Sequence, residues 1–71
     1  MIEHTTGGTM SLAELAAQHQ TQSSTILRLT AANSPGGAYP ANVANYINGV
    51  FTGKITYDQH MPAGLRLYLP S

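Results

Sequence analysis

The stretch Thr9-Met10-Ser11-Leu12-Ala13-Glu14-Leu15-Ala16 contains the clearest structural signal in this chain of 71 residues. Ser11 and Glu14 have the spacing of a capping box, in which each side chain accepts a hydrogen bond from the other residue's backbone N–H at the start of a helix. The next apolar residues recur with the period of a helix, and His19 continues their stripe at i+7. These apolar residues are Leu12, Leu15 and Ala16. The pattern predicts a helix over residues 12–20 with this face in the core.

A polar run over residues 18–24 separates this helix from a second one, for which Thr21 or Ser23 is the expected cap. The apolar residues of the second helix are Ile26, Leu27 and Leu29. We expect it to end near Asn33, because the following Ser34-Pro35-Gly36-Gly37 combines a proline, which has no N–H, with two glycines.

A third helix is predicted after Pro40, which suits a helix start. Its apolar residues recur at i, i+4, i+7 and i+8. They are Val43, Ile47, Val50 and Phe51. Gly53 is the expected C′ residue, whereas Gly49 inside the pattern costs up to about 1 kcal/mol relative to Ala.

The segment Leu65-Arg66-Leu67-Tyr68-Leu69-Pro70 alternates apolar and polar residues as a half-buried strand does, and Pro70 ends it. Residues 2–6 are the expected partner strand. The elements therefore predict one α+β domain over residues 1–71, in the order strand, helix, helix, helix, strand.

The order and spacing of these segments resemble the LysM (lysin motif) family. Thr9-Met10-Ser11-Leu12 stands at the family's first motif, Gly-Asp-Thr-Leu, and Leu15-Ala16 follows at the family's distance. Ile26-Leu27-Arg28-Leu29-Thr30 stands where its second helix ends. Met61-Pro62-Ala63-Gly64-Leu65-Arg66-Leu67-Tyr68-Leu69-Pro70 keeps its closing Gly, Leu and Pro spacing.

This resemblance implies a βααβ fold with a two-stranded antiparallel sheet, and an extra helix inserted at about residues 31–60 between the second helix and the last strand. It also implies non-catalytic binding of N-acetylglucosamine glycans such as peptidoglycan or chitin. By position, the glycan-binding residues would be Gly8, Thr9, Met10, Asn33 and Tyr57. Three family residues are missing here: the Asp of the first loop is absent, Leu65 replaces the Gln after the closing Gly, and Thr30 replaces the Asn after the second helix. These departures fall on the sugar groove, so the fold is better supported than sugar binding.

The composition narrows the possible partners. Three Lys and Arg balance three Asp and Glu, only 8% of residues are charged although 42% are hydrophobic, and cysteine is absent. This balance argues against nucleic acid and anionic lipid as partners, since both need a basic surface. No signal peptide and no apolar run near the roughly 20 residues of a membrane span are visible, so we expect synthesis in the cytosol.

Catalysis, a cofactor and a metal are not expected. The three carboxylates are far apart in sequence, and no serine lies in a nucleophile elbow. His4 and His60 could approach across the sheet, but His19 and scattered acids are the only further candidates for the three or four ligands of a zinc site.

We therefore expect a structural docking module that contacts other structural proteins or copies of itself. Small LysM-fold proteins of phage tails are similar, which implies a virion, as a tail or capsid accessory protein. The expected contact residues are Tyr39, Val43, Tyr46, Val50 and Phe51, although Tyr46 also suits the core. The alternative is a glycan-binding module at a cell wall.

Overall fold

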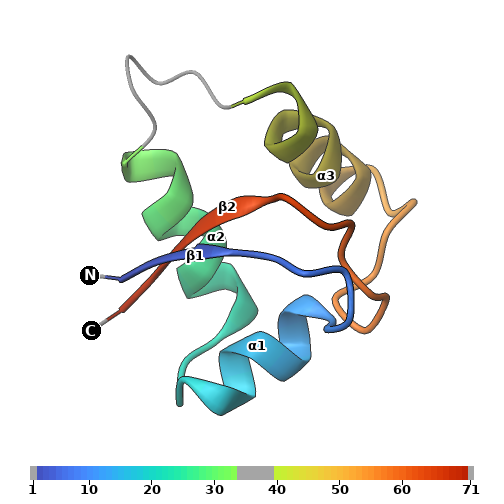
Figure 1. Cartoon of the computed structure of the whole chain (residues 1–71). Coiled ribbons are helices and arrows are strands. Elements are labelled where there is room, and N and C mark those ends of the chain that lie inside the picture. The colour runs from blue at the N-terminus through green and yellow to red at the C-terminus, as the bar shows by residue number, and fades with distance from the viewer. Residues whose placement is uncertain (1, 34–39, 71) are drawn as a thin grey trace.

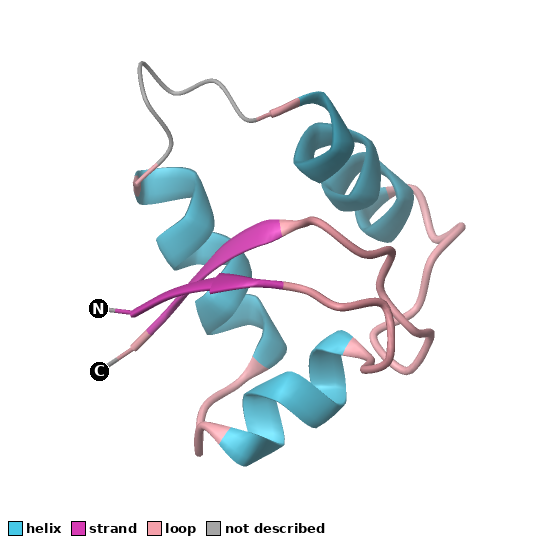
Figure 2. Ribbon diagram, viewed as in Figure 1, coloured by secondary structure: helices cyan, strands magenta, loops and turns pink. Residues whose placement is uncertain are grey.

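The computed structural model describes residues 2–33 and 40–70 of the chain. This part forms a two-stranded antiparallel sheet and three helices (Figures 1 and 2). The elements are β1 (Ile2–Thr5), α1 (Leu12–Gln18), α2 (Ser23–Ala32), α3 (Ala41–Phe51) and β2 (Arg66–Leu69). The expected α+β class, with an extra helix between the second helix and the last strand, is confirmed.

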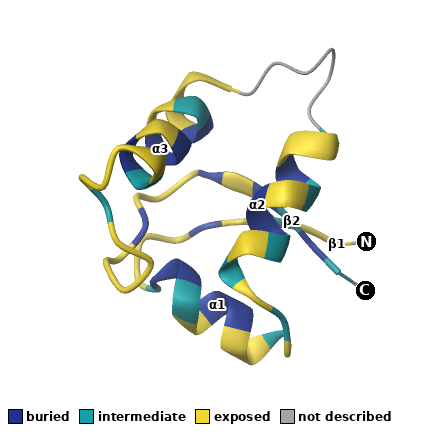
Figure 3. Ribbon diagram, turned by 180° about the vertical axis from the view of Figure 1, so that it is seen from behind, coloured by how far each residue is buried: buried dark blue, intermediate teal, exposed yellow. Residues whose placement is uncertain are grey.

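The sheet pairs Ile2 with Leu69 and His4 with Leu67. Leu67 and Leu69 are buried while Arg66 is exposed, so the alternation predicted for the last strand is confirmed. Helix α2 covers one face of this sheet in both the front and the rear view (Figures 1 and 3).

Thr30 joins α2 to β2 at the edge of the sheet. Its buried hydroxyl donates to the Ile26 carbonyl oxygen (2.8 Å) and accepts from the Tyr68 backbone N–H (3.1 Å). A β-strand at a sheet edge leaves backbone groups without a strand partner, and this bond satisfies one of them. The orientation of α2 across the sheet is therefore fixed by a polar bond as well as by apolar packing.

The predicted capping box at the start of α1 is present. The Glu14 backbone N–H donates to Ser11 Oγ (3.1 Å), and the Ser11 backbone N–H donates to Glu14 Oε1 (3.2 Å). Leu12 and Leu15 on the predicted face are fully buried.

Helix α1 ends at Gln18, two residues earlier than predicted. Gln20 has a left-handed φ of 54°, and the Thr21 N–H donates back to the Ala16 carbonyl oxygen (2.9 Å). This geometry is a Schellman motif, which satisfies the carbonyl groups of the last turn. His19 is the C-cap and is half-buried, so it does not continue the core stripe.

Helix α2 begins after Gln22, whose side chain makes no capping hydrogen bond, so the prediction of Thr21 or Ser23 as the cap is wrong. The helix ends before Asn33, as predicted. The turn predicted to follow lies mainly in residues 34–39, outside the described residues.

Helix α3 begins directly after Pro40, and the predicted C′ residue Gly53 has a φ of 78°. The helix packs onto its own domain, because its inner face is buried. The buried residues of that face are Val43, Tyr46, Ile47 and Gly49.

One apolar core lies between the three helices and β2, and Figure 3 shows buried stretches of ribbon on each of these elements. Its members are Leu12, Leu15, Ala16, Ile26, Leu27, Val43, Tyr46, Ile47, Met61, Leu65, Leu67 and Leu69. Every helix contributes to this core, so the helix inserted at residues 31–60 is part of it.

Candidate functional site

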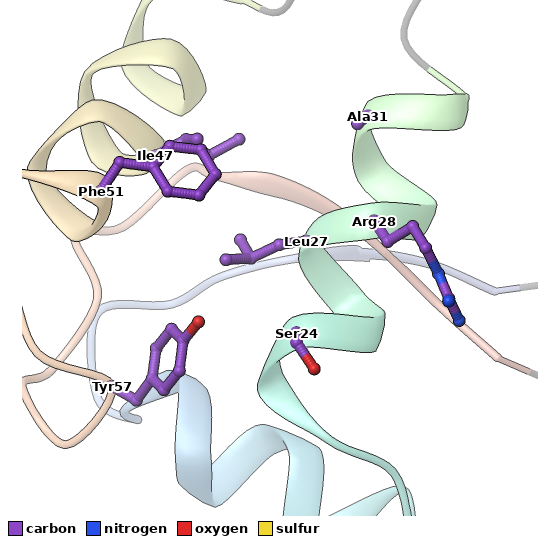
Figure 4. Close-up of a pocket in the computed structure, with 7 residues that line it drawn as sticks. All are labelled: Ser24, Leu27, Arg28, Ala31, Ile47, Phe51 and Tyr57. Carbon is purple, nitrogen blue, oxygen red and sulfur yellow. The ribbon is translucent and has the colours of Figure 1, made fainter.

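An apolar groove with a volume of about 230 Å³ lies between α2 and α3 (Figure 4). Helix α2 contributes side chains at i, i+3, i+4 and i+7, which share one face of a helix. These are Ser24, Leu27, Arg28 and Ala31. Helix α3 contributes Ile47 and Phe51, which are one turn apart, and Tyr57 closes the groove.

The floor and the rim of the groove differ in exposure. Leu27 and Ile47 are 8% and 6% exposed and belong to the core, so the floor is held by the fold. Phe51 is 78% exposed and Tyr57 is 38% exposed. Figure 4 shows both rings projecting toward the space in front of Leu27. The groove therefore combines a fixed apolar floor with an aromatic rim.

Backbone hydrogen bonds position Tyr57 at this rim. Its carbonyl oxygen accepts from the Ala13 N–H at the start of α1 (3.0 Å). The N–H groups of Lys54 and Ile55 both donate to the Gly49 carbonyl oxygen (2.9 and 3.0 Å), so the chain folds back along α3 after that helix ends. The loop is thus fixed at both α1 and α3.

Tyr46 is a core residue of α3 that does not line the groove. It is 2% exposed, and its hydroxyl has no hydrogen-bond partner among the described residues. Burial raises the pKa of the Tyr46 phenol above its ordinary 10.0, and the neighbouring Tyr57 phenol raises this pKa further. The hydroxyl therefore stays protonated at neutral pH.

Three of the predicted glycan-binding residues lie together in the loop between β1 and α1. Gly8 has a φ of 82°, and a Cβ added there would lie 3.3 Å from Ala63 Cβ. The Met10 carbonyl oxygen accepts from the Met61 N–H (2.8 Å), while Thr9 is exposed. This loop is packed against the segment that precedes β2.

The structure does not bring the other two predicted glycan-binding residues to one place. Asn33 caps the end of α2, where its Nδ2 donates to the Leu29 carbonyl oxygen (2.8 Å). Figure 1 shows this end of α2 well away from the loop between β1 and α1. Tyr57 lies beside the start of α1, next to that loop, and it also lines the groove.

The predicted contact residues also divide. Val43 and Tyr46 are buried in the core, which corrects their assignment to a contact surface, because their faces pack against this chain. Val50 is half-buried against the core, and Phe51 is exposed. Tyr39 lies outside the described residues.

The three histidines do not come together as the ligands of one metal site would. The His4 ring meets the His19 ring edge-on, with centroids 6.5 Å apart, and His60 Nε2 is 4.0 Å from Glu14 Oε1. Within residues 2–33 and 40–70, no three His, Asp or Glu side chains gather closely enough to hold a metal ion.

The sequence places Leu27 and Ile47 on helices, but it does not predict the groove that they line. It also does not identify Ser24, Arg28 and Ala31 as residues of a site. The available signal was the spacing of the α2 residues, which puts them on one face. That spacing does not show which neighbouring element the face meets.

Comparisons with known protein families, with curated proteins and with solved structures found no match for the chain. Every helix within the described ranges is too short or too polar to span a lipid bilayer.

Proposed function

We propose that this chain is a non-catalytic docking module that binds another protein through the groove between α2 and α3. The observation that carries the proposal is Phe51, a large apolar side chain that is 78% exposed beside a groove with a buried apolar floor. A single exposed apolar residue needs no explanation, but one that extends an apolar groove marks an interaction surface.

The size of the groove favours side chains of a protein as its occupants. Small-molecule sites usually enclose about 300–1,000 Å³, and an apolar cavity of about 150 Å³ holds one benzene ring. The groove, at about 230 Å³, falls between these values. One aromatic or one or two aliphatic side chains therefore suit it better than a whole ligand.

The chemistry of the lining supports binding over catalysis. Its polar groups are the Ser24 hydroxyl, the Arg28 guanidinium and the Tyr57 phenol. Within the part of the chain that the structure describes, no His, Asp or Glu lines the groove, and these are the side chains that most often serve as general bases.

We place this docking role in a virion, as a tail or capsid accessory protein. Support comes from the resemblance of residues 9–16 and 61–70 to LysM motifs, and from a surface with six charged residues in 71. Other structural proteins are the proposed partners, and a weakly charged surface suits neutral contacts of this kind.

A random peptide library displayed against the purified chain tests the docking role. We expect enrichment of peptides with a shared apolar residue, and loss of that enrichment in Phe51→Ser. The matched control is Ile2→Ser, because Ile2 is also exposed (44%) but lies on β1, outside the groove. Circular dichroism verifies that both variants are folded.

Retained enrichment in Phe51→Ser, or no enrichment with the wild-type chain, would overturn the docking proposal. Equal losses in both variants would also contradict it, because the effect would then not belong to the groove.

Glycan binding is a second candidate, favoured by the exposed ring of Tyr57 beside the start of α1. An aromatic face suits a sugar ring, and Gly8 and Thr9 are exposed in the loop that leads to α1. Titration with chitooligosaccharide, followed by NMR, separates the two candidates. Shifts at Gly8, Thr9 and Tyr57 support the glycan role, and an unchanged spectrum at millimolar sugar excludes it.

A further inference from the structure

Arg28 is the charged residue among the side chains that line the groove, and it is exposed. Among the described residues it forms no ion pair, since the pair present there joins Arg66 to Glu3 (3.4 Å), and the contact between His60 and Glu14 (4.0 Å) is an ion pair only when His60 is protonated. No carboxylate stands among the described residues that line the groove. No carboxylate of the described residues therefore compensates the positive charge of Arg28.

The position of Arg28 on α2 indicates which chemical groups a bound segment would have. Leu27 precedes it and Ala31 follows one turn later, so Arg28 borders the side of α2 that lines the groove. Figure 4 shows the Arg28 side chain extending from α2 away from Leu27, Phe51 and Tyr57. An occupant that places an apolar side chain on the floor, beside the aromatic rim, reaches the Arg28 guanidinium where it continues across α2.

We propose that the groove binds a short segment of another protein in which an apolar side chain stands close to an Asp or Glu. The apolar side chain enters between Phe51 and Leu27, and the carboxylate binds the Arg28 guanidinium. Arginine suits this role because its planar fork can donate two parallel hydrogen bonds to one carboxylate. The inference rests on the proposed docking function and names the chemistry of its partner.

Another protein fits this site better than a second copy of the chain. Of the three carboxylates, Glu3 is paired with Arg66, and Glu14 accepts from the Ser11 N–H in the capping box of α1. Among the side-chain carboxylates of the described residues, Asp58 is the one without such a partner, so a neighbouring copy offers Arg28 few carboxylates.

Peptides selected with the wild-type chain provide the test. We expect the enriched sequences to contain an acidic residue near the apolar one. Two peptides are then compared: a selected acidic peptide, and its neutral counterpart in which Glu is replaced by Gln or Asp by Asn. Each is titrated against the wild-type chain, against Arg28→Gln and against Arg66→Gln, which is the matched control on β2. Arg28→Gln should weaken the acidic peptide about two- to fivefold, the effect of an exposed ion pair, and leave the neutral peptide unchanged. Arg66→Gln should change neither.

The outcomes separate this inference from the proposed function. Enrichment of apolar peptides without an acidic residue, or equal effects of Arg28→Gln on both peptides, overturns the inference and leaves the docking role standing. The absence of any enrichment that depends on Phe51 overturns both. Concentration-dependent self-association in sedimentation velocity that is lost in Phe51→Ser assigns the groove to a second copy and also overturns the inference.

Discussion

At the scale of one residue, Tyr46 has an apolar ring that packs well in the core and a hydroxyl that does not. Its ring fills the space between α3 and the rest of the core, but its hydroxyl is buried without a hydrogen-bond partner in the described part of the chain. Burying a hydroxyl without a partner costs about 1–3 kcal/mol. The apolar ring must offset that cost.

Tyr46→Phe removes the buried hydroxyl and keeps the ring. We expect the free energy of unfolding to stay unchanged or to rise by about 1 kcal/mol, because no hydrogen bond is lost and less desolvation is needed. Urea denaturation at neutral pH measures this change. Tyr57→Phe, at an exposed ring, is the control and should change stability by less than about 0.5 kcal/mol. A clear loss of stability in Tyr46→Phe would show that the hydroxyl has a partner.

The same residue predicts a dependence of stability on alkaline pH. The pKa of Tyr46 is raised in the folded state by burial and then by Tyr57, so the unfolded chain loses this proton first as the pH increases. The contribution of Tyr46 is therefore fully present below its unfolded pKa of 10.0 and is lost as the pH rises through the folded value. Urea midpoints from about pH 9 to about pH 11 should fall less in Tyr46→Phe than in the wild type. Equal falls in both proteins would exclude this contribution.

At the scale of one element, α3 keeps a glycine in its interior because another segment packs against it. A Cβ on Gly49 would meet the side chain of Ile55, with Cγ1 at 2.8 Å. Ile55 is brought there by the hydrogen bond from its N–H to the Gly49 carbonyl oxygen. The absence of a side chain at Gly49 thus lets the loop that carries Tyr57 close onto the helix.

Gly49→Ala should destabilise the fold by about 1–3 kcal/mol through this overlap, although Ala favours a helix by about 1 kcal/mol. The effect is measured as a shift in the urea midpoint. Asn45→Ala, at an exposed position of the same helix, should be neutral or slightly stabilising. Adding Ile55→Ala should remove much of the penalty from Gly49→Ala. A more stable Gly49→Ala protein would contradict the close packing of Ile55.

At the scale of the whole molecule, one core holds every element in place. Leu15 of α1 and Ile26 of α2 are both fully buried in it. A chain of this length buries a smaller share of its surface than larger domains do. Each buried side chain is therefore a large part of the total stability.

Leu15→Ala or Ile26→Ala should each lower the free energy of unfolding by about 2–5 kcal/mol, because each leaves a cavity in a packed core. Thermal unfolding followed by circular dichroism measures the effect. Phe51→Ala removes an exposed side chain and should change stability by less than about 1 kcal/mol. An unchanged melting temperature in both core variants would place the core elsewhere.

The sequence predicts this fold where the determinants are local. Ser11 and Glu14 identify the start of α1, and Gly53 identifies the end of α3, because a cap depends on residues within one turn. The start of α2 was predicted incorrectly, since Gln22 occupies the N-cap without a side-chain bond. Its position follows from the left-handed turn at Gln20, and a glutamine is not a typical residue for that conformation.

The candidate site was less predictable, because it depends on how α2 and α3 pack together. Phe51 was identified as a contact residue from its place at the end of the apolar stripe. Val43 belongs to the same stripe and Tyr46 lies beside it, but both face the core, and the pattern does not separate the two sides. Arg28 gave no signal in the sequence, since a lone charge on a helix is usually only solvated.

The most direct test of the docking role is an NMR titration of the labelled chain with a selected peptide. Binding in the groove predicts saturable shifts of the Leu27 and Ile47 methyl signals and of the Phe51 ring signals, while the Leu69 methyl signals on β2 stay in place. Shifts confined to Gly8, Thr9 and Met10, or a spectrum unchanged at a large excess of peptide, would contradict it.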